Sequence, residues 1–279
     1  MESLTSVGQK RVNVPKIECQ LGLCIPVVID FRTDREMTIF YFPEHNLRFV
    51  RIPKNACSTV INSLGHATVQ GQHPHQFDHV FTEAVDGADE WPCFAILRDP
   101  YERIISAFLN KFTDILPEEL FVHELLDYIW RAQRGRQRPH WRRSITFREF
   151  VTHLCVFPDE QLDPHWRSQS SFLQTVKPSI YLRMDRLAAQ WSSNSLFKNI
   201  ELRSYAPHAT GSNLDVGANV IDASGEAFLG FKEICGGFPS HRQFYDPALV
   251  ELVKTRFAED YRLLQESAEK AEMAPLDDE

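Results

Sequence analysis

The sequence predicts an α/β fold: a single domain with a central, mostly parallel sheet flanked by helices. Residues 48–52 (RFVRI) and 91–97 (WPCFAIL) have the composition of strands, and each run leads through a short polar loop into a helical pattern. Repeated strand–loop–helix units favour parallel strands whose loops gather at one edge of the sheet. That edge would carry two P-loop-like phosphate-binding junctions.

The composition is that of a globular protein large enough to bury a sizeable core. The chain has 279 residues, of which 43% are hydrophobic and 24% charged. Its formal net charge of −8 argues against a nucleic-acid partner, so any anion site should be a local positive patch. The opening residues are polar and about 18 apolar residues never run together, which predicts a cytoplasmic protein without a membrane partner.

The six cysteines are scattered and lack C-x-x-C spacing, so we expect free thiols in a reducing compartment. The chain is expected to have three parts. These are an N-terminal extension at 1–36 with a β-like run at 24–31, an α/β domain at 37–270, and a frayed tail at 271–279. Within the domain, residues 204–241 are rich in Gly, Ser, Asn and Ala, which suggests a lid or insertion. The sequence leaves the oligomeric state open.

The first junction is the loop PKNACST, residues 53–59, which follows predicted strands at 37–42 and 48–52. A helix starting near Ser58 or Thr59 would direct its free N–H groups and positive dipole end toward the loop. Lys54 adds an ammonium group, so the loop is predicted to bind an anion. The spacing G-x-x-x-x-G-K-[ST] is absent, which counts against an ATPase or GTPase.

Three histidines, His73, His75 and His79, follow that helix in a stretch broken by glycine and proline. The spacing resembles a metal site, but no cysteine or supporting pattern lies nearby, and we expect no metal. Solvated loop histidines are one alternative. A general base is the other, because the pKa of imidazole is near physiological pH.

The second junction is RDPYERIISAF, residues 98–108, after the strand at 91–97. Pro100 suits the first turn of a helix, and Asp99 suits its N-cap. The polar stripe of that helix holds Arg103, Ser106 and Asn110. Arg103 is expected to form an ion pair on the helix surface.

The later segments carry further helix and strand signals. An amphipathic helix at 118–134 leads into RAQRGRQRPHWRR, whose arginines, with Trp141, would hold an acidic acceptor or form a solvated basic loop. A capping box at Thr146 and Glu149 opens the next helix. A strand is expected at 179–184 with Asp185 capping the following helix, and one last helix from 246 to 264.

The two junctions together resemble the sulfotransferase family that uses 3′-phosphoadenosine-5′-phosphosulfate (PAPS), in particular the carbohydrate and heparan 2-O-sulfotransferase type (family 2). PKNACST is similar to the family's 5′-phosphosulfate loop and RDPYERIISAF to its 3′-phosphate motif. The segment PHWRSQ resembles a loop near the family's reaction centre, which makes His165, Arg167 and Gln169 candidates for acceptor or cofactor contact. A structural tether is the alternative for that loop.

The resemblance implies transfer of the sulfuryl group of PAPS to a hydroxyl, or secondarily an amine, of a carbohydrate or small metabolite. PAPS would be a cosubstrate, Lys54 would neutralise the leaving phosphate, and His75 would be the base, with His73 second. The residues implied to bind PAPS are Pro53, Lys54, Asn55, Ala56, Cys57, Ser58, Thr59, Arg98 and Ser106.

Two other function classes stay open at this point. A P-loop-like kinase or nucleotide hydrolase would bind ATP with Mg²⁺, and it needs an acidic metal ligand that the sequence does not identify. A nucleotide-binding protein without enzymatic activity could use the same fold.

Overall fold

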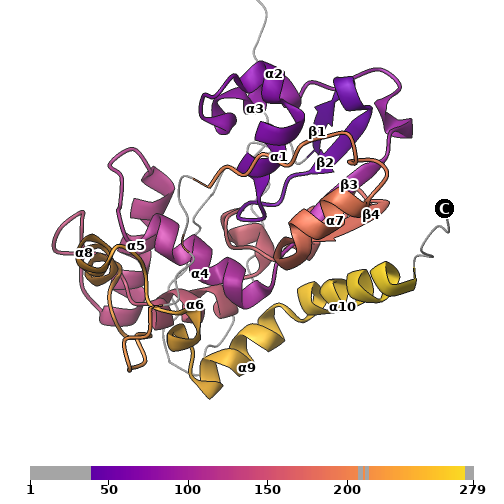
Figure 1. Cartoon of the computed structure of the whole chain (residues 1–279). Coiled ribbons are helices and arrows are strands. Elements are labelled where there is room, and N and C mark those ends of the chain that lie inside the picture. Colours follow the sequence, from indigo (N-terminus) through magenta and orange to yellow (C-terminus); the bar gives the residue numbers. More distant parts are fainter. Residues whose placement is uncertain (1–38, 207–209, 211–213, 274–279) are drawn as a thin grey trace, which may run out of the picture.

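The computed structural model describes residues 39–206, 210 and 214–273 (Figure 1). The extension at 1–36, its β-like run at 24–31 and most of the expected tail lie outside these residues. In the described part of the chain, no helix is long and apolar enough to cross a membrane.

One sheet of four strands, in the order β1-β2-β3-β4, forms the centre of the described structure. Its strands are β1 (Ile39–Phe42), β2 (Leu47–Val50), β3 (Cys93–Leu97) and β4 (Ile180–Arg183). β1 pairs antiparallel with β2 across a tight turn, whereas β2–β3 and β3–β4 are parallel. The predicted α/β fold with a mostly parallel sheet is confirmed.

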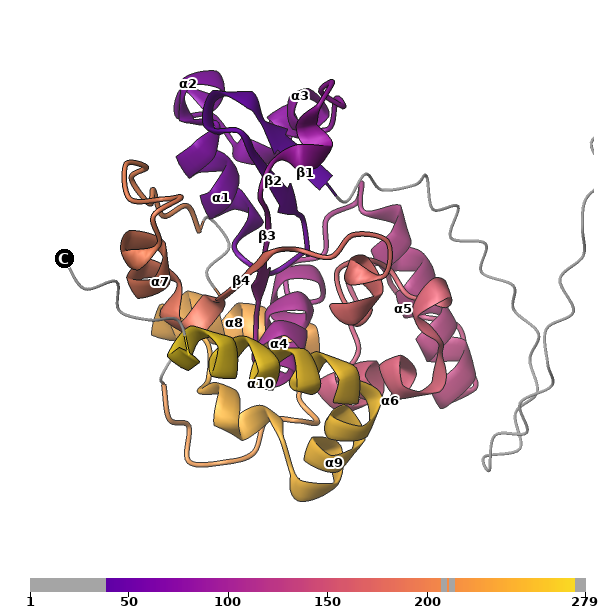
Figure 2. The same ribbon diagram turned by 90° about the vertical axis from the view of Figure 1, so that its right-hand side faces the viewer.

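Helices cover both faces of the sheet because successive strand side chains point to opposite sides. On one face Phe49 and Phe94 pack with Val60 of α1 (Cys57–Leu64). On the other face Ala95 clusters with Leu264 of α10 (Ala258–Met273). Figure 2 shows α10 crossing in front of β4. All five side chains of β3 are buried, as its continuous apolar run predicts.

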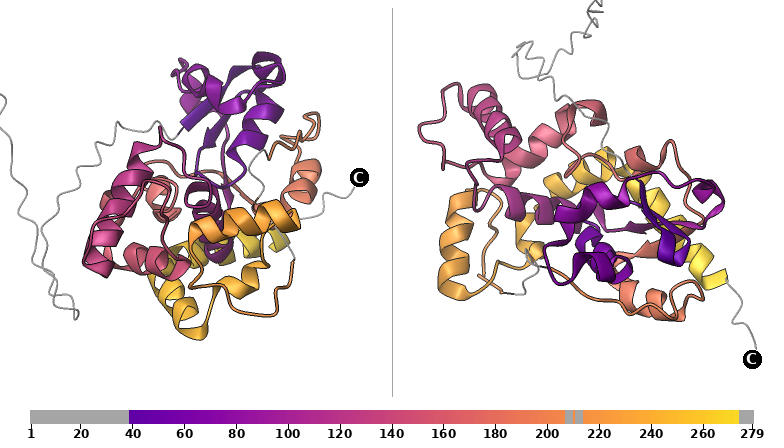
Figure 3. Two further views of the ribbon diagram at one scale, coloured as in Figure 1. Left: turned by 90° about the vertical axis from the view of Figure 1, so that its left-hand side faces the viewer. Right: turned by 90° about the horizontal axis from the view of Figure 1, so that it is seen from above.

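A second, larger core lies among the helices beyond the carboxyl ends of the parallel strands. Aromatic side chains dominate it, and Phe108, Phe112, Phe150 and Trp166 are each at most 1% exposed. These helices lie below the sheet in the left panel of Figure 3. They are α4 (Pro100–Lys111), α5 (Leu120–Arg134), α6 (Phe147–Val156), α8 (Gly225–Cys235) and α9 (Pro247–Arg256).

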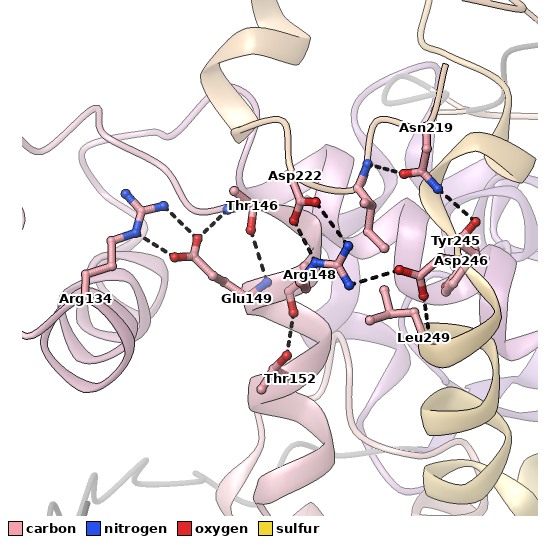
Figure 4. Close-up of polar contacts among 11 residues, drawn as sticks. Arg134, Thr146, Arg148, Glu149, Thr152, Asn219, Asp222, Tyr245, Asp246 and Leu249 are labelled. Atoms are coloured by element: carbon pink, nitrogen blue, oxygen red, sulfur yellow. Dashed lines mark hydrogen bonds and ion pairs between the residues drawn. The ribbon is translucent and has the colours of Figure 1, made fainter. Parts of the chain in front are cut away.

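The start of α6 confirms the predicted capping box and anchors two neighbouring segments (Figure 4). Thr146 accepts from the backbone N–H of Glu149, whose carboxylate accepts from the N–H of Thr146. The same carboxylate receives Arg134 of α5 at 2.6 and 2.7 Å. Arg148 reaches Asp222 and Asp246 from the other side of the helix.

Two predicted features of the later chain are wrong. The single last helix is divided at Phe257, because α9 directs Val253 and Phe257 into the helical core whereas α10 directs Leu264 to the sheet. Asp185 does not cap a helix, because its carboxylate pairs with Arg183 at 2.8 Å. The remaining short helices are α2 (His66–Val69), α3 (Asp78–Phe81) and α7 (Leu187–Ser193).

Candidate functional site

The loop after β2 contains two residues in an uncommon backbone conformation. Lys54 and Ala56 are in the left-handed region, with φ of 71° and 59°, which is uncommon for residues with a side chain. Ala56 is the N-cap of α1, and no side chain caps that helix. Turns of this kind at a helix N-terminus form a concavity of N–H groups that suits anions.

Buried amide side chains fix the loop against the second junction. Asn55, fully buried, donates to Ile96 O at 2.7 Å and to Gln169 Oε1 at 2.6 Å. Gln169 Oε1 also accepts from the N–H of Arg98 at 2.9 Å, and its Nε2 donates to Arg98 O at 2.8 Å. Asp260 of α10 receives the backbone N–H of Gln169. Gln169 is therefore a hub that joins both junctions and α10.

The two predicted phosphate-binding junctions meet directly. Arg98 Nη1 donates to the carbonyl of Lys54 at 3.1 Å. Asp99 caps α4 as predicted, since its carboxylate accepts from the N–H of Tyr101 at 2.8 Å. The parallel pairing of β2 with β3 explains this arrangement, because both loops leave the same edge of the sheet.

Four cations lie at this edge, of which Arg98 lies 3.9 Å from Glu102 and Lys111 pairs with Glu119, while Lys54 and Arg103 have no carboxylate partner among the described residues. Lys54 Nζ donates to Asn110 Oδ1, a neutral amide, at 2.5 Å, and within the described residues no carboxylate pairs with Lys54. Burial, followed by Lys111 and Arg98, lowers the pKa of Lys54 to about 7. Burial therefore disfavours the charged form of Lys54, and a bound anion would favour it.

The prediction that Arg103 forms an ion pair on the helix surface is wrong. Its side chain is buried, with the residue 1% exposed, and it donates to Pro53 O at 3.0 Å, Arg167 O at 2.6 Å and Pro164 O at 3.1 Å. Burial lowers its pKa to about 10, which leaves it charged at neutral pH. Arg103 therefore ties the first loop to the segment around residue 165 and adds a buried positive charge.

The histidine stretch reaches the same loop. His75 Nε2 lies 3.0 Å from Ser58 Oγ, and its Nδ1 lies 3.1 Å from Asp78 Oδ1. Arg51 holds the other oxygen of Asp78 at 3.3 Å. The ring of His73 is 5.7 Å from the ring of His75, so both predicted bases lie beside α1. His79, in contrast, is exposed.

Several residues of the implied PAPS loop use their side chains for hydrogen bonds to backbone groups of the protein. The Cys57 thiol donates to Ile52 O at 3.0 Å, and burial raises its pKa. The Thr59 hydroxyl bonds both backbone groups of Tyr205. Cys57 and Thr59 can therefore offer an anion only their backbone groups, and Asn55 is engaged through both its side chain and its backbone N–H, which donates to Ile52 O at 3.2 Å.

Of the two expected 3′-phosphate residues, Arg98 lies two residues before α4 and Ser106 lies on this helix. Ser106 Oγ accepts from Thr210 Oγ1 at 3.1 Å, and Thr210 belongs to the stretch predicted as a lid or insertion. His241 lies 3.1 Å from Thr210 O and pairs with Glu102. Arg203 thus bonds Ser63 of α1 and Thr210 bonds Ser106 of α4, while α8 occupies the later part of the predicted insertion.

The arginine-rich segment after α5 is largely held by ion pairs. Arg134, Arg138 and Arg143 pair with Glu149, Asp127 and Glu226, respectively. Arg142 lies over the Trp141 ring at 4.8 Å. This agrees better with a structural basic segment than with a positive patch reserved for an acceptor.

The sequence did not indicate Asn110 as the partner of Lys54 or Asp78 as the partner of His75. It also did not indicate Lys111 as a cation that acts on Lys54. Asn110 was identified only as part of the polar stripe, although a polar residue three turns along α4 can reach the loop. Asp78 lies three residues after His75, a spacing that brings side chains together only once the helical turn is known.

Comparison with protein families gives one match, to the family described as Sulfotransferase family, over residues 37–265. No curated protein and no solved structure matches the chain.

Proposed function

The chain belongs to the sulfotransferase family, and we propose that it transfers the sulfuryl group of PAPS to an acceptor hydroxyl. An amine is the second choice of acceptor. The observation that carries the proposal is the contact between the two junctions, where Arg98 donates to the carbonyl of Lys54 at 3.1 Å. PAPS carries phosphate groups at both its 5′ and 3′ ends, so it matches a site with two adjacent anion-binding junctions.

The residues at the site fit such an anionic cosubstrate. The loop supplies backbone N–H groups, and Lys54 and Arg103 supply positive charge that no carboxylate pairs with among the described residues, whereas Lys111 pairs with Glu119. The proposed ligands of the 5′ side are the 53–59 loop residues, with Cys57 acting through its backbone N–H. Arg98 and Ser106 are the proposed ligands of the 3′-phosphate.

Sulfuryl transfer needs positioning and charge stabilisation more than covalent participation of the protein. The acceptor oxygen bonds to sulfur while the bond from sulfur to the 5′-phosphate oxygen breaks. Lys54 is proposed to stabilise the negative charge that grows on that phosphate oxygen. Its tight contact with Asn110 fixes the ammonium group in place.

The acceptor proton requires a base, and His75 is our proposed base, with His73 second. Asp78 beside Nδ1 favours the tautomer with a proton on Nδ1, which leaves the lone pair on Nε2. Ser58 occupies that nitrogen at 3.0 Å, so His75 can act only when the Ser58 hydroxyl turns away, for example toward a bound phosphate.

The direct test is transfer of labelled sulfate from PAPS to glucuronic acid, 2-naphthol and 1-butanol, which represent acidic sugars, phenols and alcohols. Lys54→Ala should lower turnover by about 10²–10³-fold with an unchanged melting temperature, because it removes charge stabilisation of the leaving group. Lys177→Ala is the matched control: Lys177 is exposed and precedes β4, at the opposite edge of the sheet.

Normal turnover in Lys54→Ala would remove Lys54 from the mechanism. A protein that is stabilised by ATP with Mg²⁺ but not by 3′-phosphoadenosine 5′-phosphate (PAP) would refute the choice of cosubstrate.

A further inference from the structure

A second aspartate–histidine pair lies in the segment 163–169, which Arg103 ties to the loop of Lys54. Asp163 Oδ1 is 2.6 Å from His165 Nδ1 and also accepts from the backbone N–H of His165 at 2.9 Å. The two contacts hold the ring at Nδ1. Because a carboxylate accepts hydrogen bonds, Nδ1 carries the proton and Nε2 keeps its lone pair.

The backbone on both sides of His165 is fastened to the cosubstrate loop. Arg103 donates to Pro164 O and Arg167 O and, through Nε, to Pro53 O. Pro53 directly precedes Lys54. One buried guanidinium therefore sets the distance between the His165 backbone and the loop.

The ring of His165 is also connected to the cation cluster. It stacks on Phe121, with centroids 5.7 Å apart and an interplanar angle of 8°. Lys111 Nζ lies 5.3 Å from the centroid of the same Phe121 ring and pairs with Glu119. Lys111 follows Asn110, the partner of Lys54. His165 and Lys111 thus share a contact with Phe121, and both Lys111 and Lys54 lie close enough to His165 to act on it electrostatically.

The electrostatic surroundings keep this imidazole neutral. Burial lowers the pKa of His165, and Lys111 and Lys54 lower it further, whereas Asp163 acts in the opposite direction. The net effect lowers the pKa of His165 from its usual value of 6.5. The neutral imidazole therefore predominates at neutral pH, and Nε2 can accept a proton.

The two imidazoles differ in the state of Nε2. In His75 it is engaged by Ser58 at 3.0 Å. In His165, no hydrogen-bond partner of Nε2 is found among the described residues, and 26% of the side chain is exposed to solvent. His165 is therefore the imidazole that a ligand next to Lys54 can reach without displacing a protein group.

We propose that His165 is a second catalytic residue: while Ser58 occupies Nε2 of His75, His165 binds the acceptor hydroxyl through its own Nε2 and takes the proton in place of His75 during sulfuryl transfer. The inference rests on the proposed function. The acceptor oxygen bonds to sulfur, the bond from sulfur to the 5′-phosphate oxygen breaks, and the proton of the acceptor passes to Nε2. The imidazolium then returns the proton to water after the products leave.

The first arm of the test needs no acceptor. Nuclear magnetic resonance of isotopically labelled histidines follows the titration of His165 with and without PAP, and His165→Ala assigns its resonance. PAP should raise the pKa of His165, because it brings negative charge to Lys54. The resonance of His140, an exposed residue on the loop after α5, should not move. A His165 titration that PAP leaves unchanged overturns the proposal.

The second arm measures kcat, KM and PAP affinity with the three acceptor probes named above. His165→Ala should lower kcat by about 10²–10⁴-fold while PAP affinity stays within about twofold. Asp163→Asn keeps the shape of the pair but loses the preferred tautomer, so kcat should fall and the acid limb of its pH profile should move. His140→Ala should match the wild type.

The outcomes separate the two claims. A wild-type protein that transfers sulfate and a His165→Ala variant with kcat within twofold of it would overturn the role of His165 alone. A wild-type protein that transfers no sulfate from PAPS to any probe would contradict the proposed function. The titration with PAP would still show whether His165 lies close to bound PAP. Should His165→Ala fail to fold, Asp163→Asn and the titration of the wild type provide the decision.

Discussion

At the scale of single residues, the site is defined by cations that the protein itself balances only in part. Lys54 contacts an amide and Arg103 contacts three carbonyl groups, so neither has a carboxylate directly bonded among the described residues. Neutral partners satisfy hydrogen bonds without cancelling charge. The site therefore retains a positive potential in a protein whose formal net charge is −8.

The pKa of Lys54 gives a proton-linked prediction. In the free protein the ammonium loses its proton as the pH rises through about 7, and a bound anion should raise this pKa. PAP binding at pH 8 should therefore take up a proton, and affinity should fall as the pH rises above 7. Calorimetry in buffers of different ionisation enthalpy measures this uptake, which should be small at pH 6.

Lys54→Arg is the matched variant, because guanidinium keeps its charge but does not titrate near neutrality. It should still bind PAP, but without proton uptake at pH 8. Equal uptake in the wild type and in this variant would assign the titration to another group.

At the scale of elements, the helical core depends on close contact between α8 and the end of α4. Gly225 begins α8, and a Cβ built on it would lie 1.8 Å from Phe112 O and 2.3 Å from Ser144 Oγ. Ser144 Oγ in turn donates to Phe112 O at 2.6 Å. A side chain at 225 would have to displace the hydrogen bond between Ser144 Oγ and Phe112 O.

Gly225→Ala should therefore destabilise the fold by about 1–3 kcal/mol, the usual cost of overpacking. Gly230→Ala is the internal control, since Gly230 lies in the same helix and a Cβ there meets no atom within 4 Å. It should stabilise the protein by up to about 1 kcal/mol, because alanine favours helix. Denaturant unfolding of both variants checks the signs, and a neutral Gly225→Ala would show that α8 can shift.

Elements with local signals could be predicted from the sequence. The strands, the Asp99 cap and the capping box at Thr146 each depend on residues within a few positions of one another. The division of α9 from α10 could not, because it depends on which of two cores receives Phe257 and Leu264. Helical periodicity does not distinguish the cores.

The candidate site likewise has some features that the sequence predicts and others that only the fold reveals. Both junctions were visible as motifs, and the parallel pairing of their strands brings them together. The burial of Arg103 and the contact of Asn55 with Gln169 join residues 50 to 114 positions apart. Such pairs have no sequence signal without the fold, so their roles had to be read from the structure.

At the scale of the whole molecule, the phosphate-binding edge joins the sheet to the helical core. Lys54 comes from the sheet side, whereas Asn110, Ser106 and Lys111 lie on α4. A ligand that bridges the two junctions should therefore stabilise both parts together, since it binds only the folded protein.

PAP should raise the melting temperature more than AMP, which lacks the 3′-phosphate. At about one hundred times its Kd, a ligand contributes about 2.7 kcal/mol. Arg98→Ala should remove most of the difference between PAP and AMP in calorimetry, and higher salt should weaken PAP binding. An unchanged preference for PAP in Arg98→Ala would refute the assigned 3′ site.

The Gln169 hub also bears on the order in which the site can form. Gln169 connects to Asn55, 114 positions earlier, and to Asp260, 91 positions later. Contacts at such separations are slow to close, and during synthesis the earlier segments leave the ribosome first. The β1–β2 hairpin can pair early, but the buried amide network behind Lys54 is incomplete until α10 has been made. Competence to bind the cosubstrate should thus appear late in folding, after most of the sheet is in place.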